Sequence, residues 1–354
     1  MSVDIRKLII KGGERFDTWR KLVASRKMAV DIRKKIVNKK GGSVIDSGLE
    51  RTIKAYARDK FGSTDYWLWL ATYTELRGEF KAGWVPDDYY QCTLIPFLNP
   101  GEKSHSSTMK TFEFRLFGNY AIKPLFLLIN QLFYDPNFCV IPIDQAEMIL
   151  KEYNHEVVIK TDTGASAFST RFLDWKDIDL KDYLKLKKNL VFQPSVQQHA
   201  AISAVYSRAI NTLRITTFLD QNMGPKVMYI KLRLGANGSK VDNVKTGGLS
   251  VFIDKEGTPF NQAYDNLGLP IGDSHPDTGF KYRDIRIPNF EKALTICRES
   301  HNDYPYVRFI AWDVYIDKDA EPKLIEWNAL KPDVWINEAL IGPIWDPDLL
   351  ENNH

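Results

Sequence analysis

Two acids and an amide interrupt apolar segments near residue 320. Asp313 lies within FIAWDVYI, and Glu326 and Asn328 lie within LIEWN. If residues 317–322 form a loop between two antiparallel strands, the register places Asp313 opposite Glu326 and Ala311 opposite Asn328. The two-residue period of a strand then puts these side chains on one face of a β-hairpin.

Facing carboxylates repel each other unless a cation lies between them. With no His or Cys nearby, these oxygen ligands favour Mg²⁺ or Mn²⁺ over zinc, and Mg²⁺ in such sites usually contacts substrate phosphates. The hairpin therefore predicts a nucleotide site. The alternative is that Asp313 and Glu326 form ion pairs with basic residues of neighbouring strands. Pairing Ile316 with Lys323 also predicts that Leu324 shares the acidic face.

A second candidate for phosphate binding is the segment VVIKTDTGASAFSTRF. Lys160 ends an apolar strand there, and the loop after it consists of small residues that include Gly164 and Ser166. Small side chains let backbone N–H groups approach phosphate oxygens, and the lysine adds a point charge. The sequence contains neither GxxxxGK[ST] nor GxGxxG, so it predicts neither a P-loop nor a Rossmann site. A solvated lysine at a strand end is the alternative.

Basic side chains recur on two further predicted strands. Arg214 alternates with apolar residues in NTLRITTFL, and Lys231 and Arg233 share one face of VMYIKLRLG. Arginine suits carboxylate and phosphate because its planar group binds them with two parallel hydrogen bonds. These residues either line an anion-binding cleft or only neutralise Asp313 and Glu326.

The elements that must position these groups follow from periodicity. Helices are predicted over 14–40, from a cap at Asp46 or Ser47 to about residue 60, and over 121–133, 144–153, 198–206 and 289–300. Strands are predicted at EVVIK, AFSTRF, LVFQPSV, LRITTFL, VMYIKLRLG and SVFID, in addition to the hairpin. This pattern predicts an α+β protein with more than one packed unit.

Composition excludes several classes of protein. The 354 residues are 44% hydrophobic and 26% charged, as in an ordinary globular protein. Three dispersed cysteines predict neither a disulfide framework nor a zinc site. The sequence shows no signal-peptide pattern and no apolar run of membrane-spanning length, so we expect a cytoplasmic protein without a membrane span.

Positive charge is concentrated in the first 60 residues. They hold 17 Lys and Arg against 7 Asp and Glu, although the whole chain has a net charge of only +3. The excess is typical of a solvated helical face, or of a face for an anionic partner such as a phosphorylated carrier, a membrane surface or nucleic acid.

Taken in order, these motifs resemble the ATP-grasp superfamily, and more narrowly its sugar-transfer-associated branch. The resemblance covers roughly residues 115–335 and includes Lys160 with its loop, LVFQPSVQQH, NTLRITT, KLRLGANGSKVDNVKTGG, HPDTGF, WDVYID and LIEWN. It implies an ATP-grasp fold in which two α+β subdomains bind ATP. The subdomains would span residues 121–197 and 198–348, after a basic helical extension (1–65) and an aromatic-rich segment of unclear role (66–120).

The resemblance also implies roles for single residues. Asp313, Glu326 and Asn328 would bind Mg²⁺, Lys160 would bind phosphates beneath loop 161–167, and Lys123 would be a second phosphate-side lysine. Backbone groups between Gln193 and Val196 would contact adenine. Asp242, Asn243 and the pair Gly247–Gly248 either shape an acceptor pocket or only form turns.

The implied reaction joins a carboxylate to an amine through an acyl phosphate, with ATP converted to ADP. The acceptor would be a sugar or an intermediate of the polysaccharide biosynthesis machinery, and nucleic acid is not the expected partner. Arg214 and Arg233, with Lys160, are the candidates for stabilising developing negative charge. Amino-acid-joining members of the superfamily carry Arg two positions before the metal-binding Asp, where this chain has Ala311. Phosphotransfer to a sugar hydroxyl and non-catalytic nucleotide binding remain alternatives.

Overall fold

The computed structural model describes residues 5–162, 170–239, 242 and 247–351. The chain divides into two compact units. Unit 1 comprises residues 1–98, 267–269 and 333–354, and unit 2 comprises residues 99–266 and 270–332. Across the described ranges, no helix combines the length and the hydrophobicity that crossing a membrane requires.

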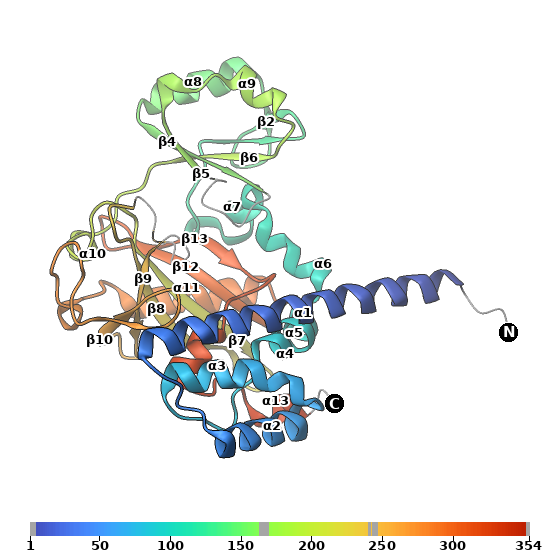
Figure 1. The fold of residues 1–354 in the computed structure, drawn as a ribbon. Helices are drawn as coiled ribbons and strands as arrows, with labels where there is room; N and C mark the ends of the chain where they lie inside the picture. Colours follow the sequence, from blue (N-terminus) through green and yellow to red (C-terminus); the bar gives the residue numbers. More distant parts are fainter. Residues whose placement is uncertain (1–4, 163–169, 240–241, 243–246, 352–354) are drawn as a thin grey trace. The chain divides into compact units, whose positions relative to one another are not determined.

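Unit 1 is helical (Figure 1). Its helices are α1 (Ile5–Lys40), α2 (Ser47–Phe61), α3 (Trp67–Arg77), α4 (Asp87–Tyr89), α5 (Ile95–Leu98), α12 (Trp335–Ile341) and α13 (Pro347–Glu351), with short turns η1 (Thr64–Tyr66) and η2 (Tyr90–Leu94). The predicted cap of α2 is confirmed, because the side chain of Asp46 accepts a hydrogen bond from the backbone N–H of Leu49 at 2.7 Å. The aromatic-rich segment, for which the sequence predicted no structure, places Trp69, Tyr73 and Trp84 in the core of this unit.

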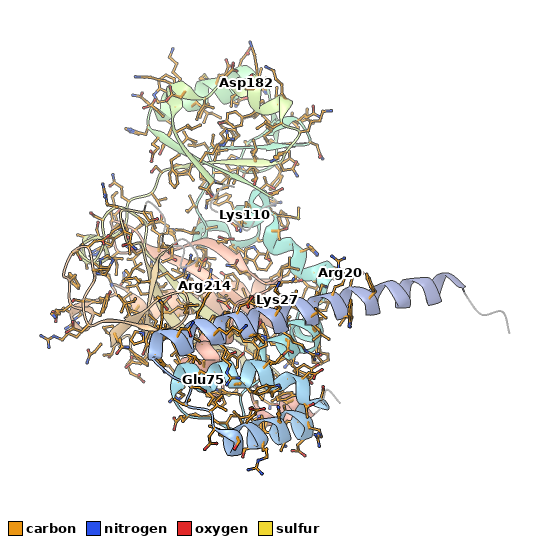
Figure 2. All side chains as sticks on the ribbon, in the orientation of Figure 1. Arg20, Lys27, Glu75, Lys110, Asp182 and Arg214 are labelled. Atoms are coloured by element: carbon orange, nitrogen blue, oxygen red, sulfur yellow. The ribbon has the colours of Figure 1, made fainter. Side chains whose placement is uncertain are left out.

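Helix α1 packs along α3 through its second half. Ala29 and Ile36 of α1 are fully buried. The buried carboxylate of Glu75 on α3, labelled in Figure 2, accepts hydrogen bonds from Arg33 Nη2 at 2.9 Å and from the backbone N–H of Val44 at 2.9 Å. Part of the basic N-terminal segment therefore has a structural role within unit 1.

The first sheet of unit 2 contains β1 (Phe126–Ile129), β2 (Leu132–Tyr134), β3 (Val140–Ile141), β4 (Glu156–Thr161), β5 (Thr170–Asp174) and β6 (Leu190–Pro194). The strand order is β3-β2-β1-β6-β4-β5. Figure 1 shows α8 (Ile143–Tyr153) and α9 (Leu180–Lys185) over one face. Phe126, Ile159 and Phe192 from the sheet share an apolar core with Leu150 and Tyr183 from these helices.

The second sheet contains β7 (Thr212–Asp220), β8 (Gly224–Leu234), β9 (Leu249–Ile253), β10 (Pro259–Tyr264), β11 (Pro270–Gly272), β12 (Phe309–Ile316) and β13 (Pro322–Asn328), in the order β11-β10-β9-β8-β7-β12-β13. Unit 2 also contains α6 (Gly101–Ser104), α7 (Glu113–Phe117), α10 (Ala200–Ser203), α11 (Phe290–Asp303) and the turns η3 (His105–Thr108), η4 (Lys110–Phe112), η5 (Gly118–Tyr120), η7 (Trp175–Asp177) and η9 (Tyr282–Asp284). One face of the sheet packs with α11 into a large apolar core that includes Ile215, Ile230, Val251 and Trp312.

Side chains alternate across a strand, so the neighbours of these core residues lie on the opposite face. The pairings Asp313↔Arg214 and Arg214↔Lys231 place the three charged residues in one row across β12, β7 and β8. The predicted common face of Lys231 and Arg233 follows from the same alternation. The structure has the predicted α+β character, with two sheets and a helical N-terminal region.

The helix predicted over residues 121–133 is wrong. This segment forms β1 and β2, joined by the two residues Asn130 and Gln131, which have φ values of 49° and 64°. Positive φ at both central residues is typical of the tight turns that join antiparallel strands. Phe126, Leu127 and Leu128 are all buried, and a strand buried on both faces reads as a continuous apolar run.

Candidate active site

The predicted β-hairpin of residues 309–328 is confirmed, and so is its register around the acidic residues. In β12 and β13, Asp313 pairs with Glu326, Trp312 pairs with Trp327, and Ala311 pairs with Asn328. The two acids and the amide lie on the face opposite the apolar core. They come from two adjacent strands, which fixes their spacing through backbone hydrogen bonds.

A β-bulge directly follows this pairing. Val314 pairs with Leu324, so Ile325 is an extra residue in β13. The remaining pairs are shifted by one position, and Ile316 lies opposite Pro322 instead of Lys323 as predicted. Leu324 is consequently buried in the apolar core, and the prediction that it shares the acidic face is wrong. Bulges of this kind redirect side chains next to functional sites.

The carboxylate of Asp313 is bound by two arginines from neighbouring strands. Arg214 donates from Nε to Oδ1 at 2.8 Å and from Nη2 to Oδ2 at 2.6 Å, so the ion pair is bidentate. Arg233 donates from Nη1 to Oδ2 of Asp313 at 2.9 Å and from Nη2 to Oδ1 of Asp242 at 3.2 Å. Asp242 also accepts a hydrogen bond from the backbone N–H of Thr212 at 3.1 Å.

These contacts determine the charge state of Asp313. Burial by itself would raise the pKa of this carboxyl, but the charges of Arg214 and Arg233 outweigh burial and hold its pKa well below the usual value. The pKa of Asp242 is raised, because burial outweighs the nearby charge of Arg233. Cationic side chains of the protein therefore already compensate the charge of Asp313. The pairing of Asp313 with Glu326 alone does not require a metal ion.

Glu326 is bound by a lysine that the sequence interpretation missed. Lys110 Nζ lies 2.6 Å from Glu326 Oε1 and 3.3 Å from Oε1 of Glu113. Lys160 Nζ, from the end of β4, donates to the carbonyl oxygen of the bulge residue Ile325 at 3.4 Å. Figure 2 labels Arg214 on the second sheet and Lys110 on the segment that precedes α7. Two lysines from outside the second sheet thus approach β13.

The two lysines differ electrostatically. The pKa of Lys110 is raised, since attraction to Glu113 and Glu326 outweighs the lowering effect of burial. The pKa of Lys160 is lowered, mainly by burial, although Glu113 and Glu326 partly oppose this effect. Burial raises the pKa of Glu113 despite the charge of Lys110. A further anion that enters beside Lys160, in addition to Glu113 and Glu326, would stabilise the charged form of Lys160.

Asp162 fixes the position of the turn that carries Lys110. Its Oδ1 accepts a hydrogen bond from the backbone N–H of Thr111 at 2.8 Å, and its Oδ2 accepts one from the Thr111 hydroxyl at 2.9 Å. Both residues are buried. Because Asp162 follows β4 directly, the strand that ends with Lys160 also positions Lys110. No short motif in the sequence links residues 51 positions apart.

Three other predicted nucleotide-binding residues fall within the described part of the chain. Gln193, on β6, is buried and donates from Nε2 to the carbonyl oxygen of Ile122 at 3.4 Å, and Val196 is half-buried just after that strand. Lys123 is exposed on the segment before β1. Within the part of the chain that the structure describes, no hydrogen bond or ion pair joins Lys123 to Glu326 or Asp313. Gly164, Ser166 and Asn243 lie outside the described residues.

The donor set of the hairpin fits a hard divalent cation. Asp313 and Glu326 would supply carboxylate oxygens, and Asn328, whose Nδ2 donates to Asp313 Oδ2 at 3.5 Å, would supply its amide oxygen. No described group of three or more His, Cys, Asp or Glu residues forms a metal site, so the third ligand would be this amide. Such an ion would have to displace Lys110 from Glu326, and the guanidinium groups from Asp313, at least in part.

A known protein family matches the part of this chain that contains the hairpin. Residues 179–343 match the sugar-transfer associated ATP-grasp family. The resemblance predicted from the motifs is thereby confirmed over these residues. The ATP-grasp match includes Arg214, Arg233 and the hairpin with Asp313, whereas Lys110 and Lys160 precede it.

Three solved structures are partly similar to this chain. An ADP complex of the N5-carboxyaminoimidazole ribonucleotide synthetase purK has 12% identity and a TM-score of 0.38, and the similarity covers 64% of this chain and 45% of that one. The ATP-grasp ligase PsnB with a precursor variant, Mg and ADP has 14% identity, a TM-score of 0.41 and coverage of 72% and 62%. A RiPP-associated ATP-grasp ligase from Chryseobacterium gregarium, with ADP and a leader and core peptide, has 12% identity, a TM-score of 0.37 and coverage of 73% and 64%.

This chain spans less than two thirds of the length of each of these three structures. The comparison with curated protein sequences gives no match.

Proposed function

We propose that this protein is an ATP-dependent carboxylate–amine ligase that attaches an amino acid or similar group to a sugar or polysaccharide intermediate. The observation that supports the proposal most strongly is the row of Asp313, Arg214 and Lys231 beside Glu326 on one sheet face. The row lies within the segment that matches the sugar-transfer associated ATP-grasp family. The name of that family motivates the choice of a sugar acceptor.

In the proposed reaction, a carboxylate oxygen of the substrate attacks the γ-phosphorus of ATP. The bond to the bridging oxygen breaks, and ADP leaves with the electron pair. An amine nitrogen then attacks the acyl carbon, the carbon–oxygen bond to phosphate breaks, and loss of a proton leaves the amide. Both steps bring together groups rich in negative charge, so they need cations and precise orientation more than a protein nucleophile.

The residues of the second sheet would meet this need. Arg214 and Arg233 would stabilise negative charge on the transferred phosphoryl group or on the tetrahedral intermediate, because both guanidinium groups already point at a carboxylate. Lys160 would bind phosphate as a point charge, and its pKa is lowered because burial outweighs the attraction of Glu113 and Glu326. Lys110 would exchange its carboxylate partners for a phosphate.

Mg²⁺, with Mn²⁺ as an alternative, would be held by Asp313, Glu326 and Asn328. When bound, such an ion neutralises phosphate charge and orients the γ-phosphoryl group. Gln193 and Val196 would lie beside adenine, and Lys123, Gly164 and Ser166 stay predictions for phosphate contacts.

Trapping of the activated acid tests the proposal. The protein is mixed with ATP, Mg²⁺ and single members of a panel of amino acids and sugar acids, hydroxylamine is added as the amine, and hydroxamate and ADP are measured. We expect one acid to give hydroxamate with equimolar ADP. Glu326→Gln should abolish both signals without loss of the circular dichroism spectrum. Glu147→Gln, at an exposed position on α8, is the matched control and should keep both.

Other outcomes would replace the proposal. Full activity of Glu326→Gln would refute the role of the hairpin acid. A stable phosphorylated sugar formed without any amine would show phosphotransfer to a hydroxyl. A folded protein that binds ATP but releases no ADP with any pair of substrates would favour a non-catalytic nucleotide-binding protein.

A further inference from the structure

The first part of helix α1 exposes large apolar side chains. The exposed fractions are 59% for Phe16, 58% for Trp19 and 47% for Val23, whereas Ala29 and Ile36 further along the helix are fully buried. Residues 16, 19 and 23 are spaced by three and four positions, so they lie on one side of the helix. Monomeric proteins rarely leave such a row of rings and branched chains in water without a use for it.

Basic side chains continue this row along the helix. At about 100° per residue, Lys27 and Lys34 lie within roughly 20° of Phe16 and almost opposite Ala29 and Ile36. Both lysines are exposed, and Arg20 lies beside them. Figure 2 labels Arg20 and Lys27 on α1. The outer face of α1 thus has an apolar end and a basic end.

Contacts within unit 1 use part of the positive charge of α1, including Lys40, which donates to the carbonyl oxygens of Glu75 and Leu76. The helix holds 13 Lys and Arg against 3 Asp and Glu. Arg26 and Arg33 face their own unit, where they pair with Asp88 at 3.1 Å and with Glu75 at 2.9 Å. The exposed lysines lie about a third of a turn away from these anchored arginines. The helix is therefore fixed by one side and presents a separate cationic side.

We propose that this outer face of α1 docks on the surface of an anionic membrane. A basic face beside Trp and Phe is the combination with which interfacial helices bind lipid, the rings entering the boundary between headgroups and acyl chains. Trp is favoured at that depth because its ring is amphipathic. The basic end would meet anionic headgroups, which attract Lys and Arg near the surface.

Two other occupants fit the face less well. A second copy of this helix would bring two strongly positive faces together, which costs free energy. Nucleic acid would use the rings as stacking platforms for bases. Here Phe16 and Trp19 stack on each other, with ring centroids 5.9 Å apart and planes 27° apart, and Val23 offers no ring.

Vesicle co-sedimentation of the full chain tests this proposal independently of any enzymatic activity. The probes are vesicles of phosphatidylcholine alone and of phosphatidylcholine with about a third phosphatidylserine. We expect binding to the anionic vesicles only, reduced strongly between about 0.1 M and 0.5 M salt, because screening shortens the reach of exposed charges. Each basic residue at the surface contributes roughly fivefold to the binding constant.

Paired variants separate the two ends of the face. Phe16→Ser with Trp19→Ser should weaken binding more than tenfold, and Arg20→Glu with Lys27→Glu should abolish it. Met148→Ser with Lys151→Glu, at exposed positions on α8, should bind like the unchanged protein. All variants are compared by circular dichroism and by urea unfolding, so that a folding defect is recognised.

Three results would overturn the proposal. The first is equal binding to both kinds of vesicle, and the second is unchanged binding of the Phe16 and Trp19 variant. The third is the same one for either rival occupant: tighter, variant-sensitive binding to duplex nucleic acid or to a second copy, the latter seen as a dimer in gel filtration that the same variants dissociate. The fluorescence of Trp19 is obtained by subtracting the spectrum of Trp19→Phe from that of the unchanged protein. A blue shift of this difference spectrum upon vesicle addition would support insertion of the ring.

Discussion

Asn99 is the residue whose loss should most directly loosen the acidic hairpin. Its side chain is buried, donates to the carbonyl oxygens of Phe309 at 2.6 Å and Ala329 at 2.7 Å, and accepts from the backbone N–H groups of Arg308 at 3.0 Å and Phe309 at 2.9 Å. One amide thus connects the start of β12 to the residue that follows β13. Asn99→Ala removes all four hydrogen bonds and leaves the backbone groups buried.

The magnitude follows from this count. A hydrogen bond in a protein contributes about 1 kcal/mol, and a buried group left unpaired costs at least as much. Four bonds therefore predict a loss of about 4 kcal/mol in the free energy that resists opening of the hairpin. Since about 1.4 kcal/mol corresponds to a factor of ten, amides near residues 308 and 309 should exchange with solvent deuterium roughly three orders of magnitude faster.

Hydrogen exchange followed by mass spectrometry measures this effect on a peptide covering residues 305–330. Asn222→Ala, the same chemical change at an exposed turn of the same unit, is the control and should leave the exchange rates unchanged. If Asn99→Ala accelerates exchange by less than about tenfold relative to this control, water or a relaxed backbone replaces the four bonds, and the reasoning is refuted.

Three further changes test other parts of the structure. Gly235→Ala should lower the free energy of unfolding by about 1–3 kcal/mol, because the new Cβ would lie 2.5 Å from a ring carbon of a buried tyrosine. Gly42→Ala is the control: its new Cβ would have no atom within 4 Å, so the free energy of unfolding should hardly change. Burial raises the pKa of Asp87 to about 8. Below that pH the folded protein keeps a proton on Asp87 that the unfolded chain has already lost, so the free energy of unfolding falls as the pH rises toward 8. Asp87→Asn should reduce this fall between pH 6 and 8, measured by urea unfolding, by about 1.4 kcal/mol per pH unit. Lys110→Met should weaken ATP binding more than tenfold by calorimetry; if Lys123→Met has that effect instead, the phosphate-side lysine is the one predicted from sequence.

The hairpin could be predicted from sequence because its information is local. Alternation in β12 and β13 predicts which residues share a face, and Asp313 does pair with Glu326. The predicted loop was one residue too long, and the extra residue Ile325 restores the predicted pairing. The bulge at Ile325 could not be predicted, since an extra residue changes the face of Leu324 without any change in local polarity. The same two-residue period predicts that Lys231 and Arg233 share a face, and the structure adds the register, in which Arg214 pairs with Lys231 and Thr212 with Arg233.

Long-range partners were the part that sequence did not provide. Lys110 follows η3 in a segment of short turns without a clear period, and only the fold brings it 2.6 Å from Glu326. Asp162 precedes a small-residue loop, and an acid at such a place in a sequence usually indicates only a turn. In the structure its carboxylate instead accepts a hydrogen bond from the Thr111 hydroxyl and holds that residue in place. Such contacts depend on how β4 and η4 meet, and a single sequence carries no record of that.

The ion pairs of the site also limit what can enter it. Asp313 is compensated by two guanidinium groups and Glu326 by the ammonium group of Lys110. A divalent cation entering alone would release protein cations without new partners. A polyphosphate entering alone would leave the buried carboxylate of Asp313 uncompensated, and either outcome costs free energy. Together, the anion takes the released cations while the metal takes the carboxylates, so every buried charge keeps a counter-charge. In the proposed ligase, the pairing would therefore favour joint entry of nucleotide and metal over either one separately, a property that neither Asp313 nor Arg214 would confer without the other.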